Sequence, residues 1–213
     1  ELKEKLEKEL RGKAEVLSKL RKKAADKFTI MVTGHIKDLG MAQGVFQAAF
    51  AETEKYGASG VDRVEFLFSA NLGMEPKPLQ KIISGGELSR VALAIKAVLL
   101  AKFGVPTMIF DEIDTGVGGI TAQKMAEKIA IIAKTRQVIC ITHLAQIASF
   151  ADNHLYIHKE VKDNSTVSLV EPLGTQEQIR EIMRMTGGTN ASNAARENAV
   201  EILAMAAKIK KTL

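Results

Sequence analysis

Acidic side chains and a histidine follow two apolar segments of the chain, at the points where predicted strands end. Asp111 and Glu112 come directly after the apolar run 107–110, and His143 comes soon after a second run, 138–141. A strand–helix–strand crossover makes its two strands parallel, so their carboxyl ends lie at one edge of the sheet. We therefore expect the three side chains to share the edge where ligands of open α/β sheets bind.

These residue types are suited to the hydrolysis of a phosphate anhydride. Asp111 offers the hard oxygen that Mg²⁺ prefers and is expected to hold that ion through a water molecule. Glu112 is suited to orient or deprotonate an attacking water, and His143 to contact a terminal phosphate. Taken singly, each is better explained as an ordinary polar strand end or loop residue. Their occurrence together and in this order favours a functional site.

A glycine-rich turn, Ser84-Gly85-Gly86-Glu87, opens a predicted helix over about 86–102. Ser84 and Glu87 have the spacing of a capping box, in which each side chain accepts a backbone N–H. Capping does not explain the two glycines, since each costs up to about 1 kcal/mol relative to alanine in a helix. A bare helix start with free N–H groups favours an anion such as phosphate. An ordinary capped turn remains the alternative.

The chain has no Gly-x-x-x-x-Gly-Lys-Ser/Thr loop, the sequence that cradles the phosphates of a bound nucleotide. We expect that loop to come from a segment preceding Glu1 or from another subunit. A first residue that is not Met also suggests a piece of a longer protein. The chain alone is therefore predicted not to hydrolyse ATP.

The elements that must position these residues follow from hydrophobic periodicity. Residues 1 to about 37 form one predicted helix with a narrow apolar stripe suited to a coiled coil: Leu2, Leu6, Leu10, Ala14, Leu17, Leu20 and Ala24. Alternating patterns predict a hairpin over 45–52 and 61–69. Thereafter the predicted order is helix 86–102, strand 106–111, helix 119–134, strand 137–142, helix 144–152, edge-hairpin strands 154–162 and 166–171, and helices 175–186 and 191–211. This order predicts an α/β fold with a mostly parallel sheet flanked by helices, plus β-hairpins.

Composition excludes several classes. With 46% hydrophobic residues the chain can bury one good core, but no apolar run approaches the roughly 18 residues of a membrane span. The single cysteine, Cys140, rules out an internal disulfide framework and fits a reducing cytoplasm. Residues 1–27 hold ten Lys/Arg against six Asp/Glu, which accounts for +4 of the net +5 charge. This excess fits either a nucleic-acid contact or the solvated face of a long helix.

Several motifs together resemble the ABC-type ATPases. Residues 83–90 resemble the signature motif, 109–112 the Walker B strand, 115–119 the D-loop and 141–143 the switch-histidine loop. Glu87 and the run 111–114 are similar to the chromosome-maintenance and DNA-repair branch rather than to transporters. Within that branch the chain resembles the bacterial RecN family from about residue 14 to its end, with 64–71, 76–78 and 182–188 as matching stretches. Gly118 stands where most ABC ATPases have the D-loop aspartate.

The resemblance implies the C-terminal lobe of a split, SMC-like ATPase head in double-strand-break repair. Residues 1–38 would be the end of a coiled-coil arm and 39–213 the head lobe. Asp111, Glu112 and His143 would act on ATP and Mg²⁺ in cis, with Gly116 also in nucleotide binding. The turn Ser84, Gly85, Gly86 and Glu87 would act in trans on a second head.

The partners implied are the N-terminal lobe of the same protein, a second head, DNA at ends or at single-strand/double-strand junctions, and a recombinase. No membrane is implied, and the expected location is the cytoplasm, in association with the nucleoid. Two alternatives stay open: the nucleotide-binding portion of an ABC transporter, and a structural coiled-coil and head module without turnover.

Overall fold

The computed structural model describes residues 1–82, 84–99, 105–162, 165–187 and 192–213. The chain divides into two compact units between residues 103 and 104, and each is described by itself. Within the described residues, no helix is both long enough and apolar enough to cross a membrane.

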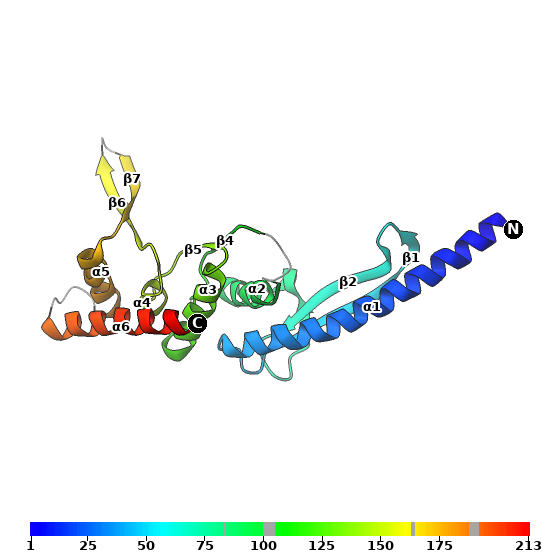
Figure 1. Ribbon diagram of the computed structural model, residues 1–213, viewed down its shortest axis with the longest axis horizontal. Coiled ribbons are helices and arrows are strands. Elements are labelled where there is room, and N and C mark those ends of the chain that lie inside the picture. The colour runs from blue at the N-terminus through cyan, green and yellow to red at the C-terminus, as the bar shows by residue number, and fades with distance from the viewer. Residues whose placement is uncertain (83, 100–104, 163–164, 188–191) are drawn as a thin grey trace. The chain divides into compact units, whose positions relative to one another are not determined.

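The first unit combines a long helix with an antiparallel hairpin. Its elements are α1 (Leu2–Asp38), β1 (Val45–Gly57), β2 (Gly60–Ser69), β3 (Lys77–Pro78), a 3-10 turn η1 (Leu79–Lys81) and α2 (Gly85–Leu99). Helix α1 runs along the β1–β2 hairpin (Figure 1). The predicted hairpin is confirmed, and it is longer than expected because pairing resumes at Gly57 and Gly60 beyond an irregularity after Glu52.

Three aromatic rings fasten α1 to the hairpin. Phe28 of α1 meets Phe46 of β1 and Phe66 of β2, with ring centroids 6.0 and 5.6 Å away, and the two strand rings stack at 5.3 Å. One turn and two turns further along the helix, Val32 and Ile36 are completely buried. Burial of these large apolar side chains supplies most of the stabilisation of the contact between α1 and the hairpin.

A polar clip lies nearer the start of the same helix. The Asp62 carboxylate of β2 accepts hydrogen bonds from the Ser18 hydroxyl at 2.6 Å and from the Arg21 guanidinium at 3.1 Å. The pKa of Asp62 is lowered, mainly by the hydrogen bond from Ser18. The hydrogen bond and charge of Arg21 and the charge of Lys22 lower it further. Lys22 also lies 5.9 Å from the centre of the Phe50 ring. The clip therefore fixes the rotation of α1 against the hairpin.

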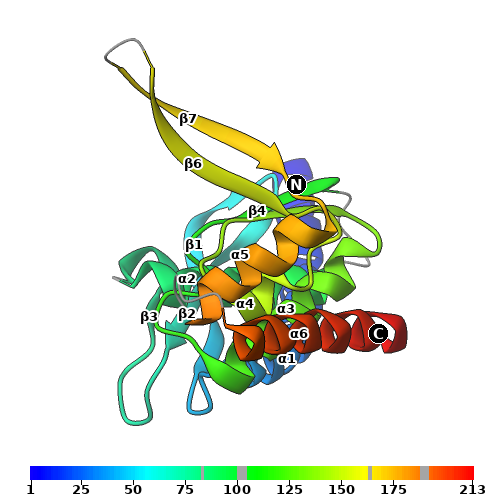
Figure 2. The same cartoon turned by 90° about the vertical axis from the view of Figure 1, so that its left-hand side faces the viewer.

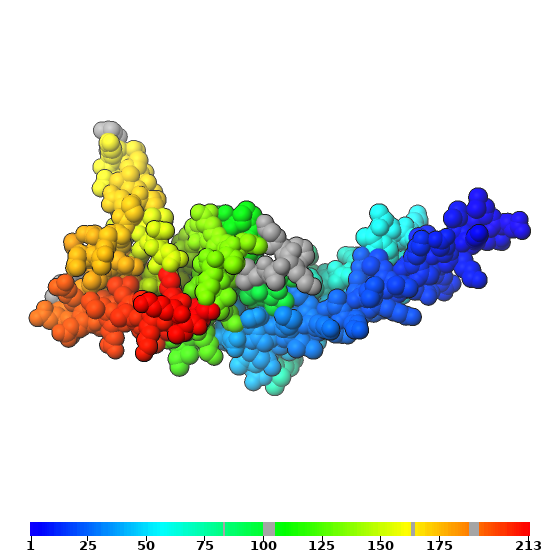
Figure 3. All heavy atoms as spheres, in the orientation of Figure 1, coloured from blue at the N-terminus to red at the C-terminus, as the bar shows by residue number. Residues whose placement is uncertain are grey.

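The first three turns of α1 have no such support. Leu2, Leu6 and Leu10 stay exposed, and these turns project beyond the hairpin (Figure 3). Further on, Leu20 is 61% exposed although it belongs to the predicted stripe. The buried residues of the helix, Ala14, Val32 and Ile36, are separated by whole turns and lie on one face. A coiled-coil partner for the leucine face stays a prediction.

Helix α2 packs against α1. Val91, Leu93 and Ala94 are fully buried, whereas Leu88 is 39% exposed. The buried face also includes Gly86 and Arg90, and Leu88, two residues after Gly86, lies on the other side of the helix.

The second unit contains the predicted strand–helix–strand crossover. Its elements are β4 (Thr107–Phe110), α3 (Gly119–Ala133), β5 (Gln137–Cys140), α4 (Ala145–Ala148), β6 (Leu155–Lys162), β7 (Ser165–Pro172), α5 (Thr175–Gly187) and α6 (Asn193–Thr212). Strands β4 and β5 are parallel, with Phe110 opposite Cys140, as predicted. The predicted hairpin β6–β7 is also confirmed, but it forms a two-stranded sheet of its own rather than an edge of the β4–β5 sheet. It projects away from α5 and α6 (Figures 1 and 2), while its turn, 163–164, lies outside the described residues.

Only one face of the β4–β5 pair is covered. Met108 and Phe110 are buried, whereas Ile109 on the opposite face is 62% exposed and its neighbour Ile139 is 44% exposed. Helix α3 packs on the covered side, and the described part of the chain holds only these two parallel strands. Burial raises the pKa of the Cys140 thiol on β5 to about 12, so this thiol stays protonated.

A small core supports the segment that follows β5. Ala145 and Ala148 of the short helix α4 pack with Ile182 of α5 and Ala199 of α6. Helix α6 begins at a Ser192 cap, whose hydroxyl accepts the Ala195 N–H at 3.1 Å. Helix α4 is shorter than the predicted 144–152, but its packing holds the preceding loop, 141–144, at a defined position.

Candidate active site

The two predicted halves of the strand-end site do meet at one edge of the β4–β5 pair. The Ile141 N–H donates to the Phe110 carbonyl at 2.9 Å, which extends the parallel ladder by one residue beyond the end of β5. Asp111 and Glu112 leave this edge on one strand, and Thr142 and His143 leave it on the other. The shared edge expected from the crossover is therefore present.

Burial alternates sharply along the turn after β4. Asp111 and Glu112 are exposed, whereas the next two residues, Ile113 and Asp114, are only 0% and 2% exposed. Ile113 anchors the turn in the apolar core, and the two preceding carboxylates consequently face solvent. This is the disposition that a carboxylate needs if it is to meet a ligand.

Glu112 has an unusual backbone. Its φ of 52° lies in the left-handed region, and it is the only non-glycine residue of the described chain that does so. For an L-residue this conformation costs about 1–2 kcal/mol, and such strain concentrates at functional sites. The turn is closed by the Thr115 N–H, which donates to the Glu112 carbonyl at 3.3 Å. Gly116 follows with a φ of 70°, which explains a glycine there.

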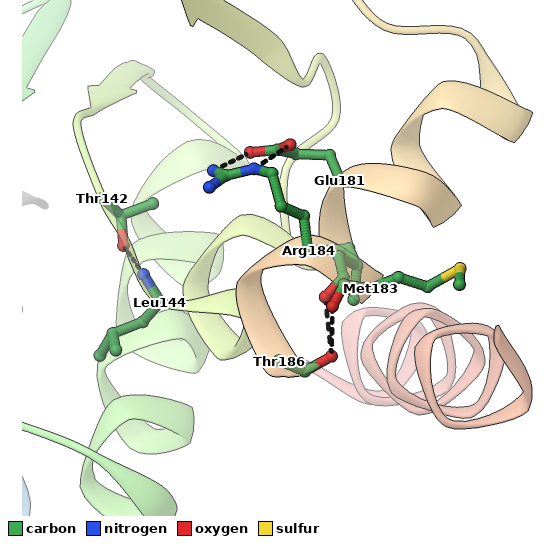
Figure 4. Close-up of polar contacts among 7 residues, drawn as sticks. Thr142, Leu144, Glu181, Met183, Arg184 and Thr186 are labelled. Carbon is green, nitrogen blue, oxygen red and sulfur yellow. Dashed lines mark hydrogen bonds and ion pairs between the residues drawn. The ribbon is translucent and has the colours of Figure 1, made fainter. Parts of the chain in front are cut away.

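Asp114 joins the two loops, and no pattern in the sequence signals this role. One of its oxygens, Oδ2, accepts from the Thr142 hydroxyl at 2.5 Å and from the His143 backbone N–H at 2.9 Å. The Nδ1 atom of the His143 ring lies 3.1 Å from the same oxygen. Thr142 in turn accepts the Leu144 N–H at 3.1 Å, as Figure 4 shows. We call Asp114, Thr142 and His143 the aspartate clasp.

The His143 side chain is held at one end and open at the other. Its ring is 70% exposed although Nδ1 contacts a carboxylate that is only 2% exposed. A group that is both anchored and accessible can present its second nitrogen, Nε2, to a ligand. The structure thus supports the predicted placement of His143, and the role assigned to it stays a prediction.

The signature-like turn belongs to the first unit and is formed as a helix start. The Glu87 N–H donates to the Ser84 hydroxyl at 3.4 Å, and the Leu88 N–H donates to the Ser84 carbonyl at 3.1 Å. Ser84 and Gly85 are exposed, whereas Gly86 is buried. The half of the capping box in which Ser84 accepts is therefore present, while Ile83 of the same motif lies outside the described residues.

Helix α5 carries a close ion pair between Arg184 and Glu181. Arg184 donates twice to the Glu181 carboxylate, at 2.8 and 2.6 Å, and the same helix is secured near its end by Thr186, whose hydroxyl donates to the Ile182 carbonyl at 2.9 Å (Figure 4). The hydrogen bonds that Arg184 donates to Glu181 raise the pKa of Arg184. Because the Arg184 side chain is 56% exposed, the pair contributes little to stability.

The strand-end carboxylates fit Mg²⁺ only as part of a larger ligand set. Among the described residues, no group of three or more His, Cys, Asp and Glu side chains is arranged to hold a metal ion. Asp111 and Glu112 offer exposed carboxylate oxygens, and Mg²⁺ is commonly bound by one or two carboxylates together with waters and substrate phosphates. The donor chemistry at this edge therefore suits Mg²⁺ that arrives with a nucleotide.

Curated proteins share extended sequence similarity with the chain, although no family model matches it. It is 40% identical over 211 residues to the DNA repair protein RecN of Bacillus subtilis, covering 92% of this chain and 37% of that protein. It is 42% identical over 196 residues to RecN of Deinococcus radiodurans, covering 92% of this chain and 34% of that protein. The chain thus spans a little over a third of the length of these relatives.

Solved structures show the same fold. The Smc head domain with a coiled coil and joint from Pyrococcus yayanosii matches with a TM-score of 0.54 at 21% identity, covering 76% of this chain and 29% of that one. The Smc head domain with an extended coiled coil from Pyrococcus furiosus matches with a TM-score of 0.50 at 22% identity, covering 78% of this chain and 39% of that one. The α/β fold is therefore that of Smc heads, and by its sequence the chain belongs to the RecN family of DNA repair proteins.

Proposed function

We propose that this chain is the C-terminal lobe of a split, SMC-like ATPase head, and that the full-length protein hydrolyses ATP in the course of DNA double-strand-break repair. The observation that carries the proposal is the edge of the β4–β5 pair, where Asp111 and Glu112 meet the His143 loop across the aspartate clasp. Membership of the RecN family supports the setting in DNA repair.

In this proposal the exposed residues of the edge divide the chemistry. Asp111 holds Mg²⁺ through a water, and Glu112 orients or deprotonates the water that attacks the terminal phosphate. Mg²⁺, when bound, neutralises charge on the phosphate oxygens. His143 contacts the terminal phosphate from the neighbouring loop. Positioning and electrostatic stabilisation are the main sources of catalysis in phosphoryl transfer, so fixed loops matter as much as reactive groups.

The signature-like turn serves a second head. Ser84 and Gly85 are exposed at a helix start, where unpaired backbone N–H groups and the helix dipole favour phosphate. We propose that Ser84, Gly85, Gly86 and Glu87 act in trans on the nucleotide of a partner head, whereas Gly116 contributes to binding the nucleotide of its own head. Because Gly118 replaces the usual D-loop aspartate, no carboxylate role is assigned to that position.

A second lobe is needed to complete the head. The exposed apolar face of the β4–β5 pair, formed by Ile109, Ile139 and Ile141, is unfavourable in water and supports a covering partner. The phosphate loop, which the chain lacks, would come with that lobe. This chain by itself is therefore expected to bind ATP weakly and to hydrolyse none. Tight stoichiometric binding of ATP to this chain alone would contradict that expectation.

The basic residues near the start of α1 are candidates for a contact with DNA. Several of its charges are already paired along the helix, including Arg11 with Glu15 at 3.2 Å and Lys13 with Glu9 at 2.7 Å. The excess of Lys and Arg nevertheless supports a DNA partner close to the arm. A role in transport is disfavoured because the relatives are DNA repair proteins.

The test of the ATPase proposal is Glu112→Gln in the full-length protein. We expect kcat to fall at least about 100-fold while ATP binding persists, since the amide keeps the shape of Glu112 but cannot accept a proton. Glu171→Gln, an exposed carboxylate on β7, is the matched control and should leave turnover unchanged. Undiminished turnover in Glu112→Gln would remove this residue from the mechanism.

A further inference from the structure

The geometry points to Asp114 as the positioning residue of the His143 ring: we infer that its buried carboxylate holds the Nδ1 proton and thereby directs Nε2 towards the nucleotide. This inference rests on the proposed ATPase function and adds a residue that acts through His143. The juxtaposition behind it is the contact of Asp114 Oδ2 with both the backbone and the ring of His143, at 2.9 and 3.1 Å.

The chemistry of the donors determines which nitrogen is fixed. An ionised carboxylate can only accept hydrogen bonds, so the ring nitrogen that contacts it must carry a proton. That condition holds for the neutral Nδ1–H ring and for the imidazolium alike. In both forms Nε2 is the nitrogen left for a ligand, and the ring cannot exchange its two nitrogens by flipping without breaking the contact.

The remaining contacts of the clasp keep the carboxylate in place. The Thr142 hydroxyl donates to the same oxygen at 2.5 Å and is itself oriented by the Leu144 N–H at 3.1 Å. Asp114 sits on a turn that Ile113 anchors, and the next helix, α4, packs into the core through Ala145. Both ends of the clasp are thus attached to buried structure, as an accurately positioned ring requires.

A structural aspartate and a positioning aspartate differ in whether their effect depends on the ring. If Asp114 acts through His143, its substitution should cost little once the ring is absent. If Asp114 only ties two loops together, its substitution should slow turnover by the same factor whether or not the ring is present. A double-mutant cycle on turnover therefore separates the two roles.

The experiment measures ATP turnover by the full-length protein with Asp114→Asn, His143→Ala and the double substitution. We expect each single variant to lower kcat about 10- to 100-fold with the KM for ATP within about threefold, and the double variant to be no slower than His143→Ala. The control is Ser149→Ala, which removes a buried 3.0 Å hydrogen bond to the Gln146 carbonyl in the same segment. Its kcat should stay at the wild-type value.

Multiplicative losses in the double variant would overturn the inference, as would wild-type turnover of Asp114→Asn. If Glu112→Gln abolishes turnover in the same assay while Asp114→Asn does not, only this inference falls. If Glu112→Gln has no effect, the proposed function falls first and this inference falls with it. The two failures are thus distinguishable.

A second measurement needs no substitution of Asp114. In full-length protein labelled with ¹⁵N-histidine, the His143 signals are those lost in His143→Gln, an exposed position where the change should not disturb folding. We expect a protonated Nδ1. A neutral His143 ring with its proton on Nε2 would overturn the inference even if Asp114→Asn failed to fold.

Discussion

Two regions are held by opposite kinds of interaction. One is the contact of α1 with the β1–β2 hairpin, and the other is the strand-end edge of β4–β5. Where α1 meets the hairpin, the rings of Phe28, Phe46 and Phe66 pack together, and the polar clip of Asp62 lies nearer the start of the helix. At the strand-end edge, a buried carboxylate gathers three polar groups on one oxygen, next to a residue in a strained backbone conformation. The first arrangement stabilises, and the second positions.

This difference follows from the physics of the two interactions. Apolar burial is non-directional and scales with area, so it secures an element without fixing each atom. Hydrogen bonds to a buried carboxylate are directional and are costly to leave unmade, so they fix particular atoms. Substitutions in the first region should therefore alter stability, whereas substitutions in the second should alter turnover more than stability.

The largest effect on folding is expected for Phe46→Ala. Phe46 is only 3% exposed and contacts both other rings, so its loss should lower the free energy of unfolding by about 3–5 kcal/mol. Urea unfolding of this chain measures the change, and hydrogen exchange should accelerate in β1 and β2. Tyr56→Ala, on the same strand but 47% exposed, is the control and should cost less than about 1 kcal/mol. Equal losses from the two substitutions would contradict the assignment of the core.

At the strand-end edge we expect stability and activity to move in opposite directions. Glu112→Gly should raise the free energy of unfolding by roughly 0.5–1 kcal/mol, because glycine tolerates a positive φ, while turnover of the full-length protein is lost. Gly116→Ala is the converse control. A Cβ there meets no atom within 4 Å, so its expected cost of about 1 kcal/mol comes from the backbone alone. A destabilised Glu112→Gly variant would show that the backbone of Glu112 is not strained.

The polar clip between α1 and Asp62 should make the free energy of unfolding depend on pH in the acid range. The pKa of Asp62 is lowered from its ordinary 3.8, so the ionised group stabilises the folded state fully above that value. The contribution is lost as the pH falls through the lower pKa of the folded state. Urea unfolding between about pH 6 and 2.5 should thus show a shallower acid decline for Asp62→Asn than for wild type. Identical declines would argue against the clip.

The smallest effect is expected at the free end of the same helix. Leu6→Gln replaces a 54% exposed leucine with another good helix former, and should change the stability of this chain by less than about 0.5 kcal/mol. Ile36→Ala, at a completely buried position of the same helix, should cost about 2–4 kcal/mol. A loss above about 1 kcal/mol for Leu6→Gln would show that the leucine face is already covered when this chain is in solution.

Local sequence was enough to predict most helices and strands, because hydrophobic periodicity and the Gly and Pro residues that end an element act over a few residues. The helix of α1, both hairpins and the β4–α3–β5 crossover were all predicted from such patterns. The shared edge of Asp111 and His143 followed too, since a strand–helix–strand crossover makes its two strands parallel. The exposed Ile109 was not foreseen, because an apolar run looks the same whether one or both faces are covered.

What the sequence by itself determined is therefore the order of elements and the edge at which the reactive residues emerge. Only the tertiary structure decided that Asp114 turns inward to Thr142 and His143, that Glu112 adopts a positive φ, and that α1 buries Val32 and Ile36 while Leu20 stays exposed. The physical reason is range. Periodicity and turn chemistry are local, whereas the partner of a buried carboxylate or the neighbour of a helix face lies dozens of residues away and exists only once the chain has packed.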